Sequence, residues 1–242
     1  MRAVAALVLK DARIVYRDSL LAFLPLYALI LALVMRLGVP FVPVDDLGLY
    51  LAPTVVQFGT ILLGTVLGFA LIEEREQGTW LLLRVLPLRQ ATLFLYLGAA
   101  STILSSVVGL AAAMVYGYPI ADPIAFSLML VAGSLLAPVV MLVLGVLATN
   151  KVEGLAVNKL VSISLLLPAL VFVAPLPWQL AAAWLPGYWV YLGLLEAYAV
   201  DPSALSAIYW PDYPDWLLVA APIGLSLGGM IGLARAYLRR AS

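Results

Sequence analysis

The chain contains no cysteine and no histidine among its 242 residues. Without cysteine, it can form neither a disulfide nor a thiolate-ligated metal site. Without histidine, it lacks the most common general base and the most common metal ligand in proteins, which excludes histidine-dependent triads and the HExxH zinc motif. The sequence therefore predicts no catalytic residue, no metal site and no cofactor bound by this chain.

Charged residues are also scarce. They make up 11% of the chain, whereas hydrophobic residues make up 65%; a soluble domain carries about 25% charged residues. A water-soluble core of this length could not bury so much apolar side chain. The composition therefore predicts an integral membrane protein. Because 13 basic residues balance 13 acidic ones, no nucleic-acid partner is expected.

Six apolar segments alternate with polar or proline-containing connections. About 20 apolar residues suffice to cross the ~30 Å hydrocarbon core. We predict an all-α membrane protein with one domain, residues 1–242, that begins with an interfacial helix over residues 1–18. An ordinary lead-in to the first span is the alternative for that segment. The predicted spans cover residues 19–37, 51–72, 91–116, 124–149, 160–174 and 216–234.

The connections carry recognisable signals. Asp122-Pro123 is typical of an N-cap followed by the first helical residue, so it should open the fourth span. Residues 150–159 are predicted to form a short polar loop. Segment 175–215 is rich in proline, tryptophan and tyrosine, which predicts short helices in, or dipping into, the outer interface. Within it, Glu196 is either an interfacial carboxylate, which we favour, or a substrate or proton site.

Two spans carry glycines at four-residue spacing, a pattern that lets another helix approach closely. We expect the row on the last span to contact the same chain, with contact across a dimer as the alternative. The rows comprise Gly64 and Gly68, then Gly224, Gly228 and Gly232.

With six spans, 12 of the 13 lysines and arginines fall on one side of the membrane, and only Arg36 falls on the other. The positive-inside rule places that side, with both termini, in the cytoplasm.

The segment 73–90 on this side holds six of the 26 charged residues. Each charge at the membrane centre costs roughly 2.5–3.5 kcal/mol, so this segment must lie in water or at the interface. The chain has no GxxxxGK[ST] phosphate loop and no mid-span acid, and therefore no evident energy source of its own. A nucleotide-hydrolysing partner would need a cytoplasmic contact, and this segment is the largest candidate.

The run from Glu74 to Leu88, EREQGTWLLLRVLPL, resembles the loop between spans 2 and 3 in permease subunits of type-2 ABC exporters. Residues 150–154 and 187–189 also look like a drug-export subgroup, whereas Gly98-Ala99 departs from the Gly-Lys of many relatives. The resemblance implies a cytoplasmic coupling helix docked on an ATP-binding subunit that holds ATP and magnesium. It also implies a second permease chain, identical or different, and a bacterial or archaeal cell membrane. The residues it assigns to coupling are Glu73, Glu74, Arg75, Glu76, Gly78, Thr79, Leu82, Leu83, Arg84, Leu86 and Pro87.

The resemblance implies outward transport of a hydrophobic or amphiphilic substrate. A stand-alone secondary transporter or channel, or a non-transport membrane scaffold, is the alternative. From polarity and depth alone, the predicted substrate-lining residues are Tyr27, Gln57, Thr60, Thr102, Ser105 and Met141.

Overall fold

The computed structural model describes residues 19–44, 46–78, 90–171, 176–199 and 213–241. Within these ranges every regular element is a helix, which confirms the predicted all-α class. The proposed interfacial helix, residues 1–18, lies outside the described residues. The elements are α2 (Ser19–Gly38), the 3-10 helix η1 (Val39–Phe41), α3 (Leu47–Glu76), α5 (Gln90–Tyr116), α6 (Pro123–Ser134), α7 (Leu136–Leu147), α8 (Lys151–Val171), α9 (Leu176–Ala182), α10 (Pro186–Tyr198) and α11 (Asp215–Ala241).

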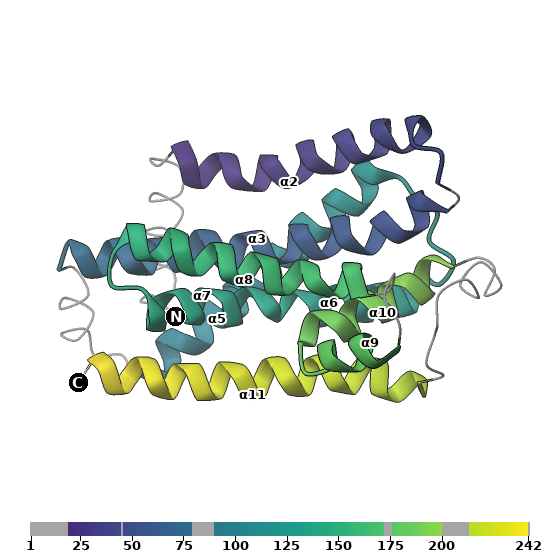
Figure 1. Ribbon diagram of the computed structural model, residues 1–242. Helices are drawn as coiled ribbons and strands as arrows, with labels where there is room; N and C mark the ends of the chain where they lie inside the picture. The colour runs from purple at the N-terminus through teal and green to yellow at the C-terminus, as the bar shows by residue number, and fades with distance from the viewer. Residues whose placement is uncertain (1–18, 45, 79–89, 172–175, 200–212, 242) are drawn as a thin grey trace.

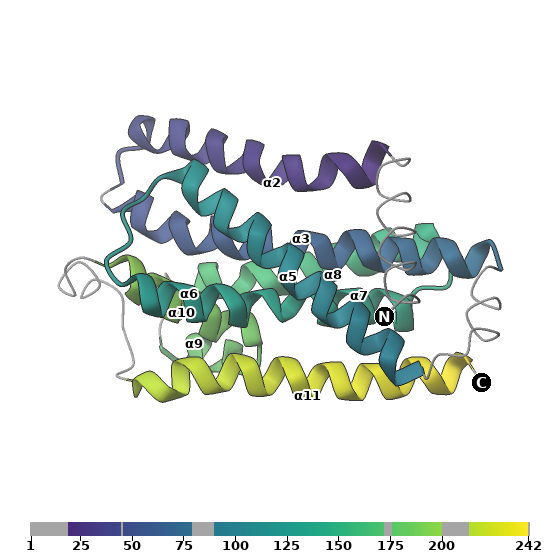
Figure 2. The ribbon, with the colours of Figure 1, turned by 180° about the vertical axis from the view of Figure 1, so that it is seen from behind.

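Helix α3 forms the centre of the bundle and contacts α2, α5, α6, α7, α8 and α10. Helices α2 and α11 lie at opposite edges (Figure 1, Figure 2). The end of α3, the start of α8 and the end of α11 meet at one end of the bundle, which we call the charged end. At the opposite end, the tyrosine-rich end, the Tyr116 hydroxyl donates to the Gly48 carbonyl at 2.8 Å.

Four helical stretches are long and apolar enough to cross a membrane, as expected for a membrane protein. Large hydrophobic side chains are exposed on α5 and α11, and lipid is the favourable surrounding for such apolar surface. Helix α11 extends beyond the predicted span 216–234 to Ala241. The four stretches are Leu47–Glu76, Leu95–Tyr116, Pro123–Leu147 and Asp215–Tyr237.

The fourth predicted span begins where its capping signal indicates. The Asp122 carboxylate accepts hydrogen bonds from the backbone N–H groups of Ile124 and Ala125, at 2.9 and 3.0 Å. The span is not one continuous helix, because α6 ends at Ser134 and α7 begins at Leu136. Pro138 explains the break, since a proline ring clashes with the carbonyl four residues earlier, here that of Ser134.

The two glycine rows have different surroundings. A Cβ added to Gly64 would lie 2.8 Å from the Ala137 Cα, and one on Gly68 would lie 2.9 Å from the Leu144 Cβ, so both glycines let α3 and α7 approach closely. By contrast, a Cβ on any glycine of the α11 row would meet no described atom within 4 Å. The expected contact of that row within the chain is therefore not found among the described residues. The four-residue spacing shows that these glycines share one face of the helix. It does not show what packs against that face. The α11 row comprises Gly224, Gly228 and Gly232.

Segment 175–215 contains short helices, α9 and α10, and their place at the outer interface stays a prediction, but the aromatic side chains of α10 face the protein interior. Tyr188, Trp189, Tyr191 and Tyr198 are all buried within the protein. Helix α10 has only 13 residues, fewer than the roughly 17–25 that a transmembrane helix needs. It therefore packs inside the bundle, against α3, α6 and α11. In and just after α9, Trp178 and Trp184 are exposed, as an interfacial position would require.

Helix α10 is held against α3 by polar contacts at two depths. The Gln57 side-chain amide donates to the Gly187 carbonyl at 3.1 Å, and the Tyr191 hydroxyl donates to the Tyr50 carbonyl at 2.7 Å. Gln57 lies in the third turn of α3, which places the start of α10 well inside the bundle.

We expect Gln57→Leu to lower the free energy of unfolding by about 0.6 kcal/mol, the average for an interhelical hydrogen bond inside a membrane protein, and by no more than about 1.7 kcal/mol. Thr60→Val is the matched control, because the buried Thr60 hydroxyl bonds to the Gln57 carbonyl of its own helix, at 2.8 Å. Thermal unfolding of the purified chain in detergent would measure both variants. A Gln57→Leu variant as stable as the control would contradict an anchoring role for this amide.

Candidate functional site

The last turn of α3 carries the charged residues that the sequence assigns to coupling. Gly78 follows the helix with positive φ, a left-handed backbone conformation. This conformation favours glycine and commonly ends helices. The Gly78 N–H donates to the Arg75 carbonyl at 3.1 Å. Gly78 therefore directly follows the C-cap of α3, as its sequence position predicts. Six coupling residues lie outside the described residues, so their role stays a prediction: Thr79, Leu82, Leu83, Arg84, Leu86 and Pro87.

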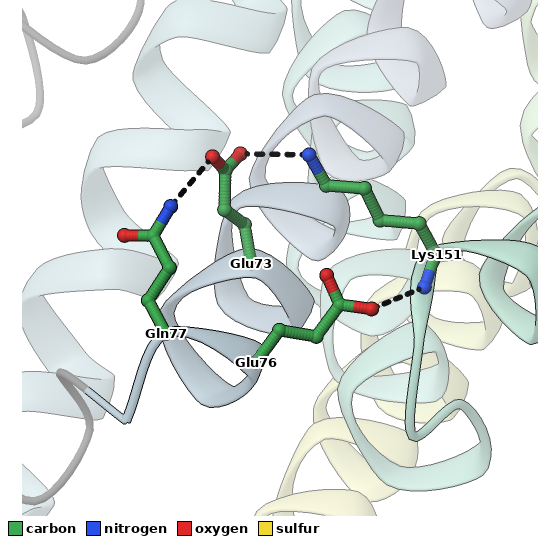
Figure 3. Close-up of polar contacts among 4 residues, drawn as sticks. All are labelled: Glu73, Glu76, Gln77 and Lys151. Carbon is green, nitrogen blue, oxygen red and sulfur yellow. Dashed lines mark hydrogen bonds and ion pairs between the residues drawn. The ribbon is translucent and has the colours of Figure 1, made fainter.

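Two carboxylates of α3 bind the first residue of α8 (Figure 3). The Glu73 carboxylate lies 3.2 Å from the Lys151 ammonium, and the Glu76 carboxylate accepts a hydrogen bond from the Lys151 backbone N–H at 3.0 Å. Gln77 donates to the other Glu73 oxygen at 2.9 Å. The Lys151 and Glu73 side chains are 50% and 30% exposed, so this ion pair contributes only about 0–1 kcal/mol. Together with the Glu76 hydrogen bond, it links the start of α8 to the end of α3.

Helix α8 starts with a reciprocal cap. The Asn150 side-chain oxygen accepts from the Glu153 N–H at 2.9 Å. In return, the Glu153 carboxylate accepts from the Thr149 N–H and hydroxyl at 2.8 and 2.7 Å. The predicted polar loop over residues 150–159 is therefore wrong, because helix begins at Lys151. The Asn150-x-x-Glu153 spacing is itself the signal of a capping box, and it marks this start in the sequence.

The hydrogen bonds from Thr149 hold the pKa of Glu153, at the charged end, below its usual value, because they favour the ionised carboxylate. A group with a lowered pKa stabilises the fold above its unfolded pKa, about 4.3 for glutamate, and loses this contribution as pH falls through the folded value. We therefore expect Glu153→Gln to unfold at a slightly lower temperature than wild type at pH 7, with the difference closing below about pH 4. Melting curves at both pH values would test this; an equal difference at both would contradict it.

Arg75 points in another direction, into the bundle. Its guanidinium donates to the Gly145 carbonyl at 3.0 Å and to the Ala148 carbonyl at 3.2 Å. These are acceptors at the end of α7, where helix carbonyls lack partners within the helix. The guanidinium carbon also lies 5.2 Å from the centre of the Tyr237 ring on α11, within the range of a cation–π interaction. Glu74 is half-buried in the same turn.

The acidic residues and Arg75 therefore make contacts in different directions. Glu73 and Glu76 contact Lys151, whereas Arg75 contacts α7 and α11. The charged end thus joins α3 to three other helices. Lys151, Glu153 and Tyr237 complete this arrangement. Lys151 and Glu153 belong to the segment 150–154 that resembles the drug-export subgroup, whereas Tyr237 is not among the predicted residues. The capping spacing could identify Glu153, but no sequence signal pairs Tyr237 with Arg75.

The predicted substrate-lining residues have different surroundings. Gln57 and Thr60 are buried between α3 and its neighbours, and Met141 is buried in a separate cluster with Leu71 and Leu142. Tyr27 is exposed on α2, where its ring packs edge-on against Phe58 with centroids 5.9 Å apart.

The remaining two predicted lining residues lie on α5. Thr102 donates to the Gly98 carbonyl of its own helix at 2.8 Å, and Ser105 is fully buried. Polarity and depth do not determine which face of a helix meets which neighbour. The lining of a substrate path therefore stays a prediction.

A second polar contact between α3 and α8 lies deeper in the bundle. The Thr65 hydroxyl is 2.9 Å from the Asn158 side-chain oxygen. Closer to the charged end, a Cβ on Gly154 would lie 2.8 Å from the Ile72 Cδ1, so glycine allows α8 to pack closely on α3 there. Helix α8 is thus held to α3 over its first two turns, not only at the Lys151 ion pair.

Comparison with known proteins relates this architecture to export permeases. Residues 11–221 match the model of a family described as fluoroquinolones export permease protein Rv2686c-like. Two curated proteins of Mycobacterium tuberculosis, each named as a fluoroquinolones export permease, are 30% identical over 204 residues, covering 78% of this chain and 80% of theirs. They are protein MT2760 of strain CDC 1551 / Oshkosh and protein Rv2686c of strain ATCC 25618 / H37Rv. The match confirms the resemblance to drug-export permeases, and the chain belongs to the Rv2686c-like family of fluoroquinolones export permease proteins.

Proposed function

We propose that this chain is the membrane-spanning subunit of an ATP-driven exporter and that it moves hydrophobic or amphiphilic drugs, fluoroquinolones among them, out of the cell. The family membership carries the proposal, because two relatives with 30% identity are named as fluoroquinolones export permeases. The charged end supports the proposed coupling to an ATP-binding subunit. It fixes the end of α3, directly before the segment that resembles a coupling helix, to the neighbouring helices.

The proposed topology has six spans. Helices α2 and α8 have 20 and 21 residues. Helix α2 is long enough to cross the hydrocarbon core, and in α8 the proposed span is the apolar part after Lys159, within the predicted range 160–174. With this topology, 12 of the 13 basic residues lie on the side of the charged end. The positive-inside rule then makes the charged end and both termini cytoplasmic, in the cell membrane.

The proposed mechanism is a rigid-body motion. Two permease chains pair, and the segment 79–89 of each docks on one ATP-binding subunit, with Leu82, Leu83 and Leu86 forming the apolar contact. ATP, bound with magnesium in the partner, closes the two ATP-binding subunits. The docked segments move with them and shift the spans between inward- and outward-facing arrangements. The chain itself supplies the path and the contact, but no hydrolytic chemistry.

Transport into inside-out vesicles tests this proposal. Vesicles from native cells that contain the chain should accumulate a fluoroquinolone when ATP is added, and vesicles from cells lacking the chain should not. Uptake that follows an imposed proton gradient without ATP would favour a stand-alone secondary transporter. No uptake under either condition would contradict a fluoroquinolone exporter.

A further inference from the structure

Three helix ends meet at one side chain at the charged end. Arg75 lies in the last turn of α3, shortly before Gly78. It donates to the carbonyls of Gly145 and Ala148 at the end of α7, at 3.0 and 3.2 Å. Its guanidinium carbon lies 5.2 Å from the ring centre of Tyr237 on α11. One side chain therefore connects the end of α3 to both α7 and α11.

The Tyr237 ring is fixed in place by its surroundings. Its side chain is almost completely buried, at 1% exposure. A Cβ on Gly145 would lie 3.0 Å from the ring, so glycine at this position allows the ring to pack directly on α7. The same glycine supplies one of the carbonyls that Arg75 binds. The Tyr237 ring, the Arg75 guanidinium and the end of α7 therefore all contact one another.

The chemistry of arginine suits this position. Its planar guanidinium presents donors in a fixed fork, so it can bind two carbonyls and place a flat face against a ring at the same time. A positive charge is also favourable beside the carbonyl end of a helix, here α7. Lysine would keep the charge but lose the fork, and a neutral side chain would leave the α7 carbonyls without this donor.

Different residues join α3 to α8. Glu73 and Glu76 hold Lys151, and neither carboxylate is part of the Arg75 contacts with α7 and α11. The end of α3 therefore makes two separable connections, one to α8 through acidic side chains and one to α7 and α11 through Arg75. Each can be removed without deleting the other.

We propose that Arg75 is a positioning residue that ties α7 and α11 to the end of α3, so that displacement of the segment after Gly78 moves all three helices together. The coupling role rests on the proposed function, in which that segment is driven by an ATP-binding partner. In this proposal Arg75 contacts residues of its own chain and transmits movement between its helices. It is not a charge that binds the partner.

Distance measurements on the purified chain test the contact without a partner. Because the natural chain has no cysteine, spin labels can be attached to pairs of introduced cysteines alone. Exposed Gln77 on the α3 side pairs with exposed Arg235 on α11 to report the Arg75 connection, and with exposed Val152 on α8 to report the Lys151 connection. Labelled chains would be measured in lipid nanodiscs.

We expect Arg75→Met to broaden the 77–235 distance distribution and leave 77–152 unchanged. Lys151→Met, the matched control, should leave the 77–235 distribution unchanged. Tyr237→Leu should resemble Arg75→Met, whereas Tyr237→Phe, which keeps the ring and loses only the hydroxyl, should broaden the 77–235 distribution less. An unchanged 77–235 distribution in both Arg75→Met and Tyr237→Leu would overturn the proposal.

Transport in the intact complex tests the coupling role. Arg75→Met should still co-purify with the ATP-binding partner and support ATP hydrolysis, while ATP-dependent transport falls at least 10-fold; Arg75→Lys should recover part of it. If Arg75 only stabilised the fold, Arg75→Met would lower co-purification, ATP hydrolysis and transport together, in proportion to the amount of folded chain. Undiminished transport by Arg75→Met would overturn the proposal. A wild-type complex without ATP-dependent transport would instead overturn the proposed function, whatever the distances show.

Discussion

Replacing Gly64 with alanine is expected to destabilise the chain by about 2–3 kcal/mol, within the range for overpacking a close contact. The added Cβ would lie 2.8 Å from the Ala137 Cα and 2.9 Å from the Ala137 carbonyl carbon, and closer still to its oxygen. Carbon atoms in contact prefer about 3.5–4.0 Å. Since the neighbour is backbone, no side chain can rotate away, and α3 and α7 must move apart.

Gly228→Ala on α11 is the matched control. There a Cβ would meet no described atom within 4 Å, and alanine favours a helix by about 1 kcal/mol over glycine. The two substitutions should therefore change stability in opposite directions. For a chain of this length, a loss of about 2–3 kcal/mol lowers the melting temperature by roughly 4–12 °C. Equal melting temperatures for Gly64→Ala and wild type would contradict the close packing of α3 on α7.

Changing Leu82 and Leu83 together to aspartate is expected to abolish ATP-dependent transport. In the proposed complex these leucines form an apolar contact with the ATP-binding subunit. Burying an unpaired carboxylate there costs several kcal/mol per group, enough to weaken binding by more than a hundredfold. Vesicle uptake should therefore fall to the level of vesicles that lack the chain.

The control for this double change is Val152→Asp with Leu155→Asp, two substitutions at exposed apolar residues of α8 that precede the predicted span 160–174 and lie outside the proposed coupling segment. This variant should keep binding to the ATP-binding subunit. A double aspartate variant that transports as well as wild type would show that segment 79–89 does not carry the coupling contact.

Local sequence signals predict helix ends well. Asp122-Pro123 opens α6 and Gly78 follows the end of α3, because caps and left-handed glycines act through the adjacent backbone alone. At the start of α8 the polarity of residues 150–159 favours a loop, whereas the capping spacing of Asn150 and Glu153 indicates the helix that is found. The residues that determine each of these helix ends are close together in the sequence, so the sequence alone can predict the helix ends.

Packing between helices is less predictable. Lipid and protein interior are similarly apolar, so hydrophobicity does not distinguish a face that meets lipid from one that meets another helix. Gly64 and Gly68 contact α7, whereas the equally spaced glycines of α11 meet no described atom. The tyrosines of α10 are buried, although tyrosine is also typical of the membrane interface. The resemblance predicts that Arg75 is a coupling residue, but its contacts with α7 and Tyr237 depend on tertiary structure.

Co-purification tests the central claim most directly. The tagged chain would be isolated from its native membrane in mild detergent, and the bound proteins identified, for wild type and for the variant with Leu82 and Leu83 both changed to aspartate. We predict that an ATP-binding subunit accompanies wild type and the α8 control but is lost from the aspartate variant. Isolation of wild type alone, or a partner that binds both forms equally, would contradict an exporter driven through this segment.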